Sequence, residues 1–175
     1  FSMLYMPLYR KLISELPKIG TVRMMQLNYA QYSSRYDRYL QGVVTPVFDP
    51  SMSGGCLRDI NIYNLCFLIG IFGPPRTIHL AANKGFNGVD TSGTLVMHYP
   101  TAVASASAAK DSNGLSNAVI QGEKGWIEVK GSVSIMQEFT VHVTGEEPAV
   151  FRSDSGRHRL SYEFEEFWRL VHDRP

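Results

Sequence analysis

Asp59 and Tyr63 are two side chains whose types and spacing could move a proton. In an α-helix, residues four apart lie one turn apart on a common face. A phenol in this position can act as a general acid or base, and the carboxylate can orient or polarise it. The same spacing also fits a core helix with one solvated aspartate and one half-buried tyrosine, because i,i+4 polar pairs are common on helices.

A glycine pair, Gly54 and Gly55, comes directly before the apolar run that carries Asp59 and Tyr63. Pro50 and the glycines indicate a loop, and Gly70 lies where the helix is expected to stop. Small glycines at the mouth of a helix would let a ligand approach the positive end of its dipole. A stripe at helical spacing is expected to face the core: Leu57, Ile60, Asn64, Phe67 and Leu68.

A polar and aromatic segment, Ser33–Thr45, supplies further candidate ligand-binding groups in Arg35, Tyr36 and Arg38. Such a segment commonly covers a binding cleft, and its arginine and tyrosine donors suit a polyol, a sugar or a carboxylate. The alternative is a solvated surface loop.

Other chemistries find no support in the sequence. The histidines are scattered, without an H-E-x-x-H motif, and no cysteine pair has zinc spacing, so no metal site is expected. No G-x-S-x-G elbow or P-loop occurs. Cys56 and Cys66 are ten residues apart on one predicted helix, about 15 Å, too far to form a disulfide. Free thiols indicate a reducing compartment, and we expect a cytoplasmic protein.

The size and composition are those of one globular domain, residues 1–175. Hydrophobic residues make up 44% and charged residues 19%, and the net charge of +1 gives no footprint for nucleic acid or an anionic membrane. No apolar run is expected to reach the roughly 18 residues that span a bilayer. The chain begins at Phe1 without a leader pattern, which we interpret as a cut or processed end.

The order of predicted elements is a helix, a strand, a loop, the central helix, a run of strands and a final helix. The first helix is expected over Leu4–Leu16 and the first strand over Thr21–Tyr32. The later strands are expected at Thr77–Ala82, Gly93–His98, Ala102–Ala109, Ser116–Gln121, Trp126–Val129 and Glu138–Val143. The final helix, Arg159–His172, is expected to bury Leu160, Phe164, Phe167, Trp168 and Val171. This order predicts an α+β fold, a mainly antiparallel sheet with its helices on one face.

Four segments resemble one known family and occur in the family's order. Gly54–Tyr63 resembles the signature helix of the glucose–fructose oxidoreductase / inositol dehydrogenase (Gfo/Idh/MocA) family, which has glycines, an Asp, and a His or Tyr four residues later. Asn117–Val129 resembles its late hairpin, Tyr162–Phe167 its closing helix, and Pro7–Gly20 the helix that leads into its second domain. Asn61 stands where members often have glycine.

The resemblance implies the C-terminal domain of an NAD- or NADP-dependent oxidoreductase that acts on a hydroxyl or carbonyl of a sugar, polyol or related compound. The family's N-terminal Rossmann domain, with its G-x-G-x-x-G fingerprint and E-K-P lysine, is not in this sequence, so this chain alone is expected to be inactive. Expected partners are that domain, a small-molecule substrate, and a second copy that covers the free sheet face in a homodimer or higher oligomer. No nucleic acid or membrane partner is expected.

By the same resemblance, Tyr63 exchanges a proton with the substrate hydroxyl while hydride passes to or from nicotinamide. Asp59 orients that hydroxyl or Tyr63, and Gly54 and Gly55 contact the nicotinamide end of the cofactor. A tyrosine needs a nearby cation to work near neutral pH, and the family's lysine would supply it. The alternative is a non-catalytic regulatory or dimerisation module derived from the same family, in which Asp59 and Tyr63 are leftovers.

Overall fold

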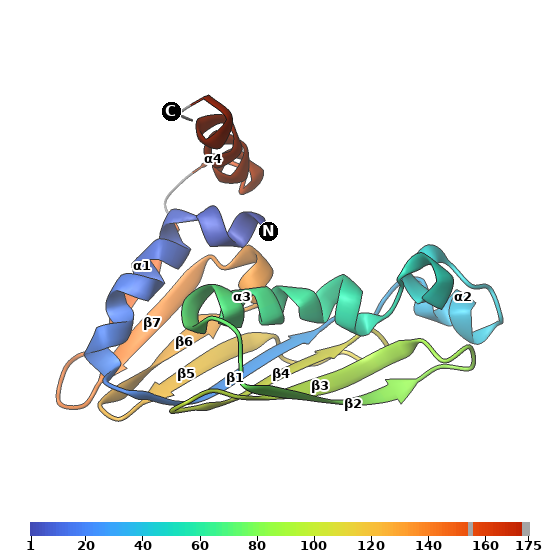
Figure 1. Cartoon of the computed structure of the whole chain (residues 1–175), viewed down its shortest axis with the longest axis horizontal. Helices are drawn as coiled ribbons and strands as arrows, with labels where there is room; N and C mark the ends of the chain where they lie inside the picture. Colours follow the sequence, from blue (N-terminus) through green and yellow to red (C-terminus); the bar gives the residue numbers. More distant parts are fainter. Residues whose placement is uncertain (154–155, 173–175) are drawn as a thin grey trace.

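A single open sheet of eight strands runs through the part of the chain that the structure describes (Figure 1). The structure is a computed structural model and describes residues 1–153 and 156–172. The strand order is β2-β3-β4-β1-β5-β6-β7-β8. The β1–β4 pair is parallel and the other neighbours are antiparallel. The strands are β1 Val22–Ala30, β2 Thr77–Lys84, β3 Asp90–His98, β4 Val103–Ala109, β5 Asn117–Gly122, β6 Gly125–Lys130, β7 Glu138–Val143 and β8 Ala149–Arg152.

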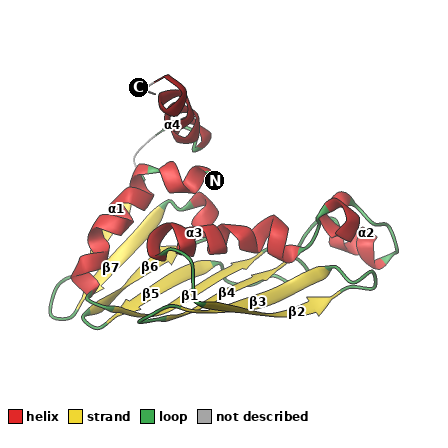
Figure 2. Ribbon diagram, in the orientation of Figure 1, coloured by secondary structure: helices red, strands yellow, loops and turns green. Residues whose placement is uncertain are grey.

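The longer helices near the sheet lie over one of its faces and leave the other face open (Figure 2). They are α1 Pro7–Glu15 and α3 Ile62–Phe72, the latter preceded by a π-helical segment, η5 Leu57–Asn61. The short helix α2 Tyr36–Leu40 lies at one end of the sheet, and α4 Leu160–His172 projects away from the sheet, beyond the N-terminal turn on the helix side (Figure 1). Single 3₁₀ turns occur at Ser2–Tyr5, Leu16–Ile19, Pro46–Phe48, Pro50–Met52 and Val133–Ile135.

Strand β4 shows how the sequence selects the two faces of the sheet. Successive side chains of a strand point to opposite faces. Ala104, Ala106 and Ala108 are buried beneath the helices, whereas the residues between them are more exposed. Because the inward residues are alanines, the central helix can approach the strand closely, and its Asn61 side chain donates a hydrogen bond to the Ala106 carbonyl oxygen.

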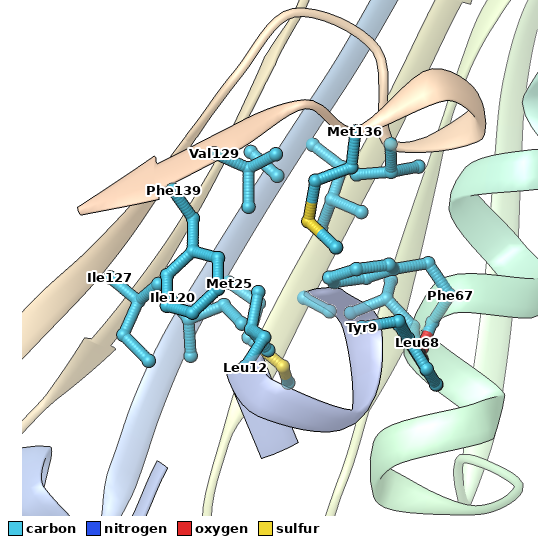
Figure 3. Packing of buried hydrophobic residues seen from close by; sticks show 14 of the residues in the cluster. Tyr9, Leu12, Met25, Phe67, Leu68, Ile120, Ile127, Val129, Met136 and Phe139 are labelled. Atoms are coloured by element: carbon cyan, nitrogen blue, oxygen red, sulfur yellow. Dashed lines mark hydrogen bonds between the residues drawn. The ribbon is translucent and has the colours of Figure 1, made fainter. Parts of the chain in front are cut away.

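The core fills the space between α1, α3 and the inner face of the sheet (Figure 3). Tyr9 and Leu12 come from α1, and Phe67 and Leu68 come from α3. Their sheet partners include Met25, Ile120, Ile127, Val129 and Phe139, all of them fully buried. The burial of apolar surface on this scale is what holds the helices on the sheet.

The predicted fold class, an open and mainly antiparallel sheet with helices on one face, is confirmed. One α-helix and one strand were not predicted: α2 forms inside the expected loop Ser33–Thr45, and β8 is added to the edge of the sheet. The central helix was expected to stop at Gly70, but it continues to Phe72. The next residue, Gly73, caps it with φ +73°, a left-handed conformation that suits glycine.

The expected burial of the final helix is wrong. All five residues assigned to its buried side are exposed, from 40% for Leu160 to 68% for Phe164. The helix is amphipathic as predicted, but of the described residues in it Tyr162 packs against the core cluster, and the other contacts of this segment with the chain are polar. Arg159 donates to the Ser134 carbonyl oxygen at 2.9 Å, and Glu163 pairs with the N-terminal amine at 3.0 Å. Its apolar face therefore lacks a covering surface among the described residues.

The stretch Pro50–Phe72 is, by length and composition alone, long and apolar enough to cross a membrane. The expectation that no apolar run reaches this length is therefore wrong by that measure. Core helices that lie on a sheet pass the same test, and one such stretch is weak support for a membrane span. Here Ser53, with φ +61°, interrupts the stretch, and Asn64 is fully buried against β4. These are the contacts of a core helix.

Candidate functional site

The candidate site lies where the parallel strands β1 and β4 end together, with Ala30 paired to Ala109. The next residue, Lys110, continues the inward alternation of Ala104, Ala106 and Ala108, so its side chain lies on the helix side of the sheet. Lys110 is only 6% exposed. Lysines are almost never buried to this extent without a partner.

The partner of Lys110 is Asp59, whose carboxylate Oδ2 accepts from the ammonium group in an ion pair. The Lys110 side chain is 7% exposed and the Asp59 side chain 45% exposed, so the pair reaches from the interior to the surface. The ammonium nitrogen also lies 5.8 Å from the centroid of the Phe48 ring, within the range of a cation–π contact. The structure thus gives Asp59 a buried cationic neighbour that the sequence pattern did not indicate.

Asp59 and Tyr63 are both described, and no hydrogen bond joins them. The first residues of the central helix, Leu57–Asn61, are π-helical, so the α-helical spacing that predicted a common face does not hold where Asp59 lies. Tyr63 is half-buried and packs against two aromatic rings. Its centroid is 6.4 Å from that of Tyr29 and 5.7 Å from that of Phe1.

The glycine pair has a structural role at the start of this helix. A Cβ at Gly54 would lie 2.6 Å from the Pro46 carbonyl oxygen, and a Cβ at Gly55, where φ is +124°, would collide with the Asp90 carboxylate. That carboxylate accepts a hydrogen bond of 2.6 Å from the Leu57 amide. A carboxylate is favourable at a helix N-terminus because it faces the positive end of the dipole. The glycines therefore let Asp90 reach the helix, and their predicted contact with a cofactor stays a prediction.

A surface hollow of about 320 Å³ opens beside Asp59. It is lined by Pro46, Val47, Met52, Ser53, Gly54, Arg58 and Asp59. This volume is at the lower end of the range for ligand pockets, so the hollow suits a small ligand or one end of a larger one. A larger hollow of about 730 Å³ between β8 and α4 contains none of the predicted site residues.

The predicted substrate-binding residues Arg35, Tyr36 and Arg38 lie on α2 and directly before it. Tyr36 packs in an aromatic cluster, 5.7 Å from Phe48 and 5.9 Å from Tyr39 between ring centroids. Burial is the main cause that raises the pKa of Tyr36, so its hydroxyl remains a donor at neutral pH. Both arginines are exposed, and neither makes an ion pair with a described residue. Since Phe48 also contacts Lys110, the cluster connects α2 to the Asp59 end of the sheet.

Lys110 is the residue that sequence reasoning missed. A signal was available in residues 104–110, where Ala alternates with other small residues and Lys110 falls at the next inward position. Among residues 1–153 and 156–172, no group of three or more His, Cys, Asp or Glu side chains lies together as a metal site would require.

The comparison with protein families agrees with this geometry. The model of the GFO/IDH/MocA C-terminal domain matches residues 10–128. The chain belongs to the GFO/IDH/MocA family. The matched region includes the central helix with Asp59 and Tyr63, the Lys110 position, and most of the β5–β6 hairpin. The family expected from the sequence is therefore confirmed, while the closing helix, Tyr162–Phe167, lies outside the matched region.

Curated relatives in this family are oxidoreductases about two and a half times as long as the matched region. YgjR, an oxidoreductase of Escherichia coli (strain K12), is 35% identical over 130 residues, which are 74% of this chain and 40% of that protein. The scyllo-inositol 2-dehydrogenase (NADP(+)) IolU of Bacillus subtilis (strain 168) is 37% identical over 125 residues, 71% of this chain and 38% of that protein. The chain thus spans less than half the length of these relatives.

Solved structures show the same fold at low sequence identity. A levoglucosan dehydrogenase in complex with NADH and levoglucosan superposes with a TM-score of 0.80 at 16% identity, over 98% of this chain and 55% of that one. The aldose-aldose oxidoreductase from Caulobacter crescentus, complexed with glycerol, superposes with a TM-score of 0.79 at 17% identity. This match covers 99% of this chain and 53% of that one. At this identity the likeness supports the GFO/IDH/MocA fold and nothing finer.

Proposed function

We propose that this chain is the substrate-binding, catalytic and dimerisation domain, residues 1–175, of an NAD- or NADP-dependent oxidoreductase that acts on a hydroxyl or carbonyl of a sugar, polyol or related compound. The observation that carries the proposal is the placement of Asp59, with its buried cation Lys110, beside an open hollow in the family's signature helix. The relatives named for inositol, levoglucosan and aldose chemistry support the substrate class.

The proposed roles combine the family resemblance with the positions of the side chains. Asp59 accepts a hydrogen bond from the substrate hydroxyl, since its carboxylate is 45% exposed beside the hollow. Tyr63 takes or returns the hydroxyl proton. Arg35, Tyr36 and Arg38 supply further donors from α2. Gly54 lines the hollow and would contact the nicotinamide end of the cofactor, and Gly55 lies next to it. The cofactor, when bound, supplies the hydride acceptor or donor.

The hollow suits a small ligand or one end of a larger one, and the sheet has no βαβ unit with a glycine-rich turn in the described residues. We therefore assign the rest of the cofactor to a Rossmann domain of the longer protein and expect this chain alone to be inactive. We further propose a cytoplasmic location and a homodimer or higher oligomer through the open sheet face, with no nucleic acid or membrane partner.

The test of the proposed function is Tyr63→Phe in the full-length protein. We expect kcat for NAD(P)-dependent polyol or sugar oxidation to fall by at least about 10²-fold, the low end for the loss of a general acid or base. Tyr162→Phe, on α4 and beside Arg157, is the matched control and should leave turnover unchanged. Unchanged turnover in Tyr63→Phe would remove this residue from the mechanism.

A non-catalytic module of the same family is the second candidate. Two observations favour it: Asp59 bonds to Lys110 and not to Tyr63, and Asp90 already gives a structural reason for Gly55. The upstream sequence separates the candidates. A dinucleotide fingerprint together with the E-K-P lysine supports the enzyme, and a fingerprint without that lysine supports the regulator.

A further inference from the structure

Lys110 is held in place by its backbone as well as by its ion pair. Its amide donates to the Thr91 carbonyl oxygen at 2.9 Å, and its own carbonyl oxygen accepts from the Ser33 amide at 2.9 Å. The residue is thus fixed between β3 and the segment that leads into α2. With its Cα fixed and its side chain 7% exposed, the ammonium group has little freedom to move.

The ammonium holds one oxygen of Asp59 and leaves the other available. Oδ2 bonds to Lys110, and no described residue donates a hydrogen bond to Oδ1. Since the Asp59 side chain is 45% exposed and lines the hollow of about 320 Å³, the free oxygen is within reach of a ligand there. A carboxylate fixed on one side by a cation needs little reorganisation when it accepts a hydrogen bond on the other.

Stability alone is a poor explanation for this pair. A buried lysine in an ion pair generally adds little to stability compared with a well-packed apolar residue, because both charges must lose water. The inward positions that precede Lys110 on β4 are all alanine, and an apolar residue at 110 would continue them. The charge is instead placed beside Asp59, the one carboxylate among the residues that line the hollow.

We propose that Lys110 is a positioning residue of the active site, which acts by fixing Asp59 so that Oδ1 faces the substrate hydroxyl. This inference rests on the proposed function, and it assigns to the chain its own cation in addition to the lysine expected from the Rossmann domain. It also implies that Asp59 orients the substrate directly, since Lys110 and not Tyr63 is its partner within the chain.

A double-mutant cycle in the full-length protein tests the proposal, with Lys110→Met, Asp59→Asn and the double variant. Methionine keeps the length of the buried stem and removes the charge. If Lys110 acts through Asp59, each single variant lowers kcat/KM by about 10-fold or more, and the double variant matches Asp59→Asn to within about twofold. The loss should lie in kcat/KM for the polyol and not in the KM for the nucleotide. Lys124→Met, in the exposed β5–β6 turn, is the control and should keep wild-type kinetics.

Multiplicative losses in the double variant would overturn the proposal, because Lys110 would then act independently of Asp59. If Lys110→Met does not fold, Lys110→Arg enters the same cycle. It keeps the buried charge but moves it, so its loss of kcat/KM should also disappear in the Asp59→Asn background. If Tyr63→Phe abolishes turnover but the losses from the Lys110 and Asp59 variants multiply, the proposed function stands and this inference alone is rejected. A full-length protein without any turnover rejects the proposed function and this inference together.

Discussion

Cys56 lies at the N-terminal end of the central helix, 1% exposed and close to charged groups. Burial and then the Asp90 carboxylate raise the pKa of its thiol to about 12, from an ordinary value of 9.0. Since only the thiolate is nucleophilic, such a thiol is inert. The helix start that carries Gly54, Gly55 and Asp59 therefore has no reactive cysteine.

This predicts slow alkylation of Cys56 by iodoacetamide at pH 8. A rise of the thiol pKa from 9.0 to about 12 lowers the thiolate fraction about 10³-fold, so labelling in the folded chain should be much slower than in urea, by about 10-fold or more once the higher nucleophilicity of such a thiolate is allowed for. Mass spectrometry of timed samples measures the rate. Cys66, half-buried on the same helix, is the internal comparison. Labelling of Cys56 at the same rate with and without urea would contradict this account.

A pattern in the chain can mark candidate site residues, but it does not identify partners that come from distant parts of the sequence. The signature stretch marked Asp59 and Tyr63, but nothing local shows that Asp59 pairs with a lysine 51 positions later. Likewise Gly55 was read as room for a ligand, whereas the group that approaches it is Asp90, from the start of β3. Long-range polar pairs depend on sheet register, which the sequence constrains only loosely.

At the level of elements, the central helix is positioned by two buried asparagines. Asn61 donates to the Ala106 carbonyl oxygen at 2.9 Å, and Asn64 donates to that of Ser107 at 3.1 Å. They bond to each other at 3.0 Å. The apolar stripe predicted the buried face of this helix correctly at Phe67 and Leu68. It could not predict the π-helical start, because both helix types place apolar residues on one side over a single turn.

Helix α1 and the 3₁₀ turn that follows it share a buried carboxylate. Glu15 is 3% exposed and pairs with Lys11 at 2.6 Å and with Lys18 at 2.7 Å. Burial raises the pKa of Glu15, but the hydrogen bonds from the two lysines outweigh it, so the pKa is lowered overall. A carboxyl whose pKa is lower in the folded state stabilises it above the unfolded-state pKa, and this contribution is lost as the pH falls through the folded-state value.

We therefore expect Glu15→Gln to lower the free energy of unfolding by about 1.5–3 kcal/mol at pH 7, the range for hydrogen bonds to charged groups. The difference from the wild type should shrink below about pH 4, where the unfolded carboxyl is already protonated. Urea denaturation at pH 7 and pH 3.5 measures both values. Glu147→Gln, at an exposed position in the connection between β7 and β8, serves as the control. An equal loss at both pH values would show that packing, not charge, explains the effect.

For the whole molecule, the order of elements in the sequence was enough to predict the architecture. It was not enough to predict which apolar surfaces are covered by other parts of the chain. Regular strand spacing predicted an open sheet with helices on one face, and β1–β4 is its parallel pair. The final helix shows the limit. Its amphipathic pattern predicted a buried side, yet Phe164, Phe167 and Trp168 are 60% or more exposed. An amphipathic sequence specifies that a face can be buried, but not which surface covers it.

The open face of the sheet makes the proposed dimer testable. Ile127 and Val129 of β6 point into the core, so Trp126 lies on the opposite, open face. It is 45% exposed and stacks on His142 of β7, with centroids 4.3 Å apart. Met24 and Val103 are further apolar residues of the same face, both also partly exposed. Aromatic residues in the centre of an interface commonly carry much of its binding energy.

If a second copy covers this face, Trp126→Glu should convert the dimer to a monomer, because a buried carboxylate without a partner opposes association. Sedimentation velocity at micromolar concentration would show the mass fall by half, and the circular dichroism spectrum should be unchanged. Leu40→Glu introduces the same charge at an exposed apolar residue of α2, away from this face, and should remain dimeric. A Trp126→Glu protein that stays a dimer would place the interface elsewhere, and the exposed aromatic face of α4 would then be the next surface to test.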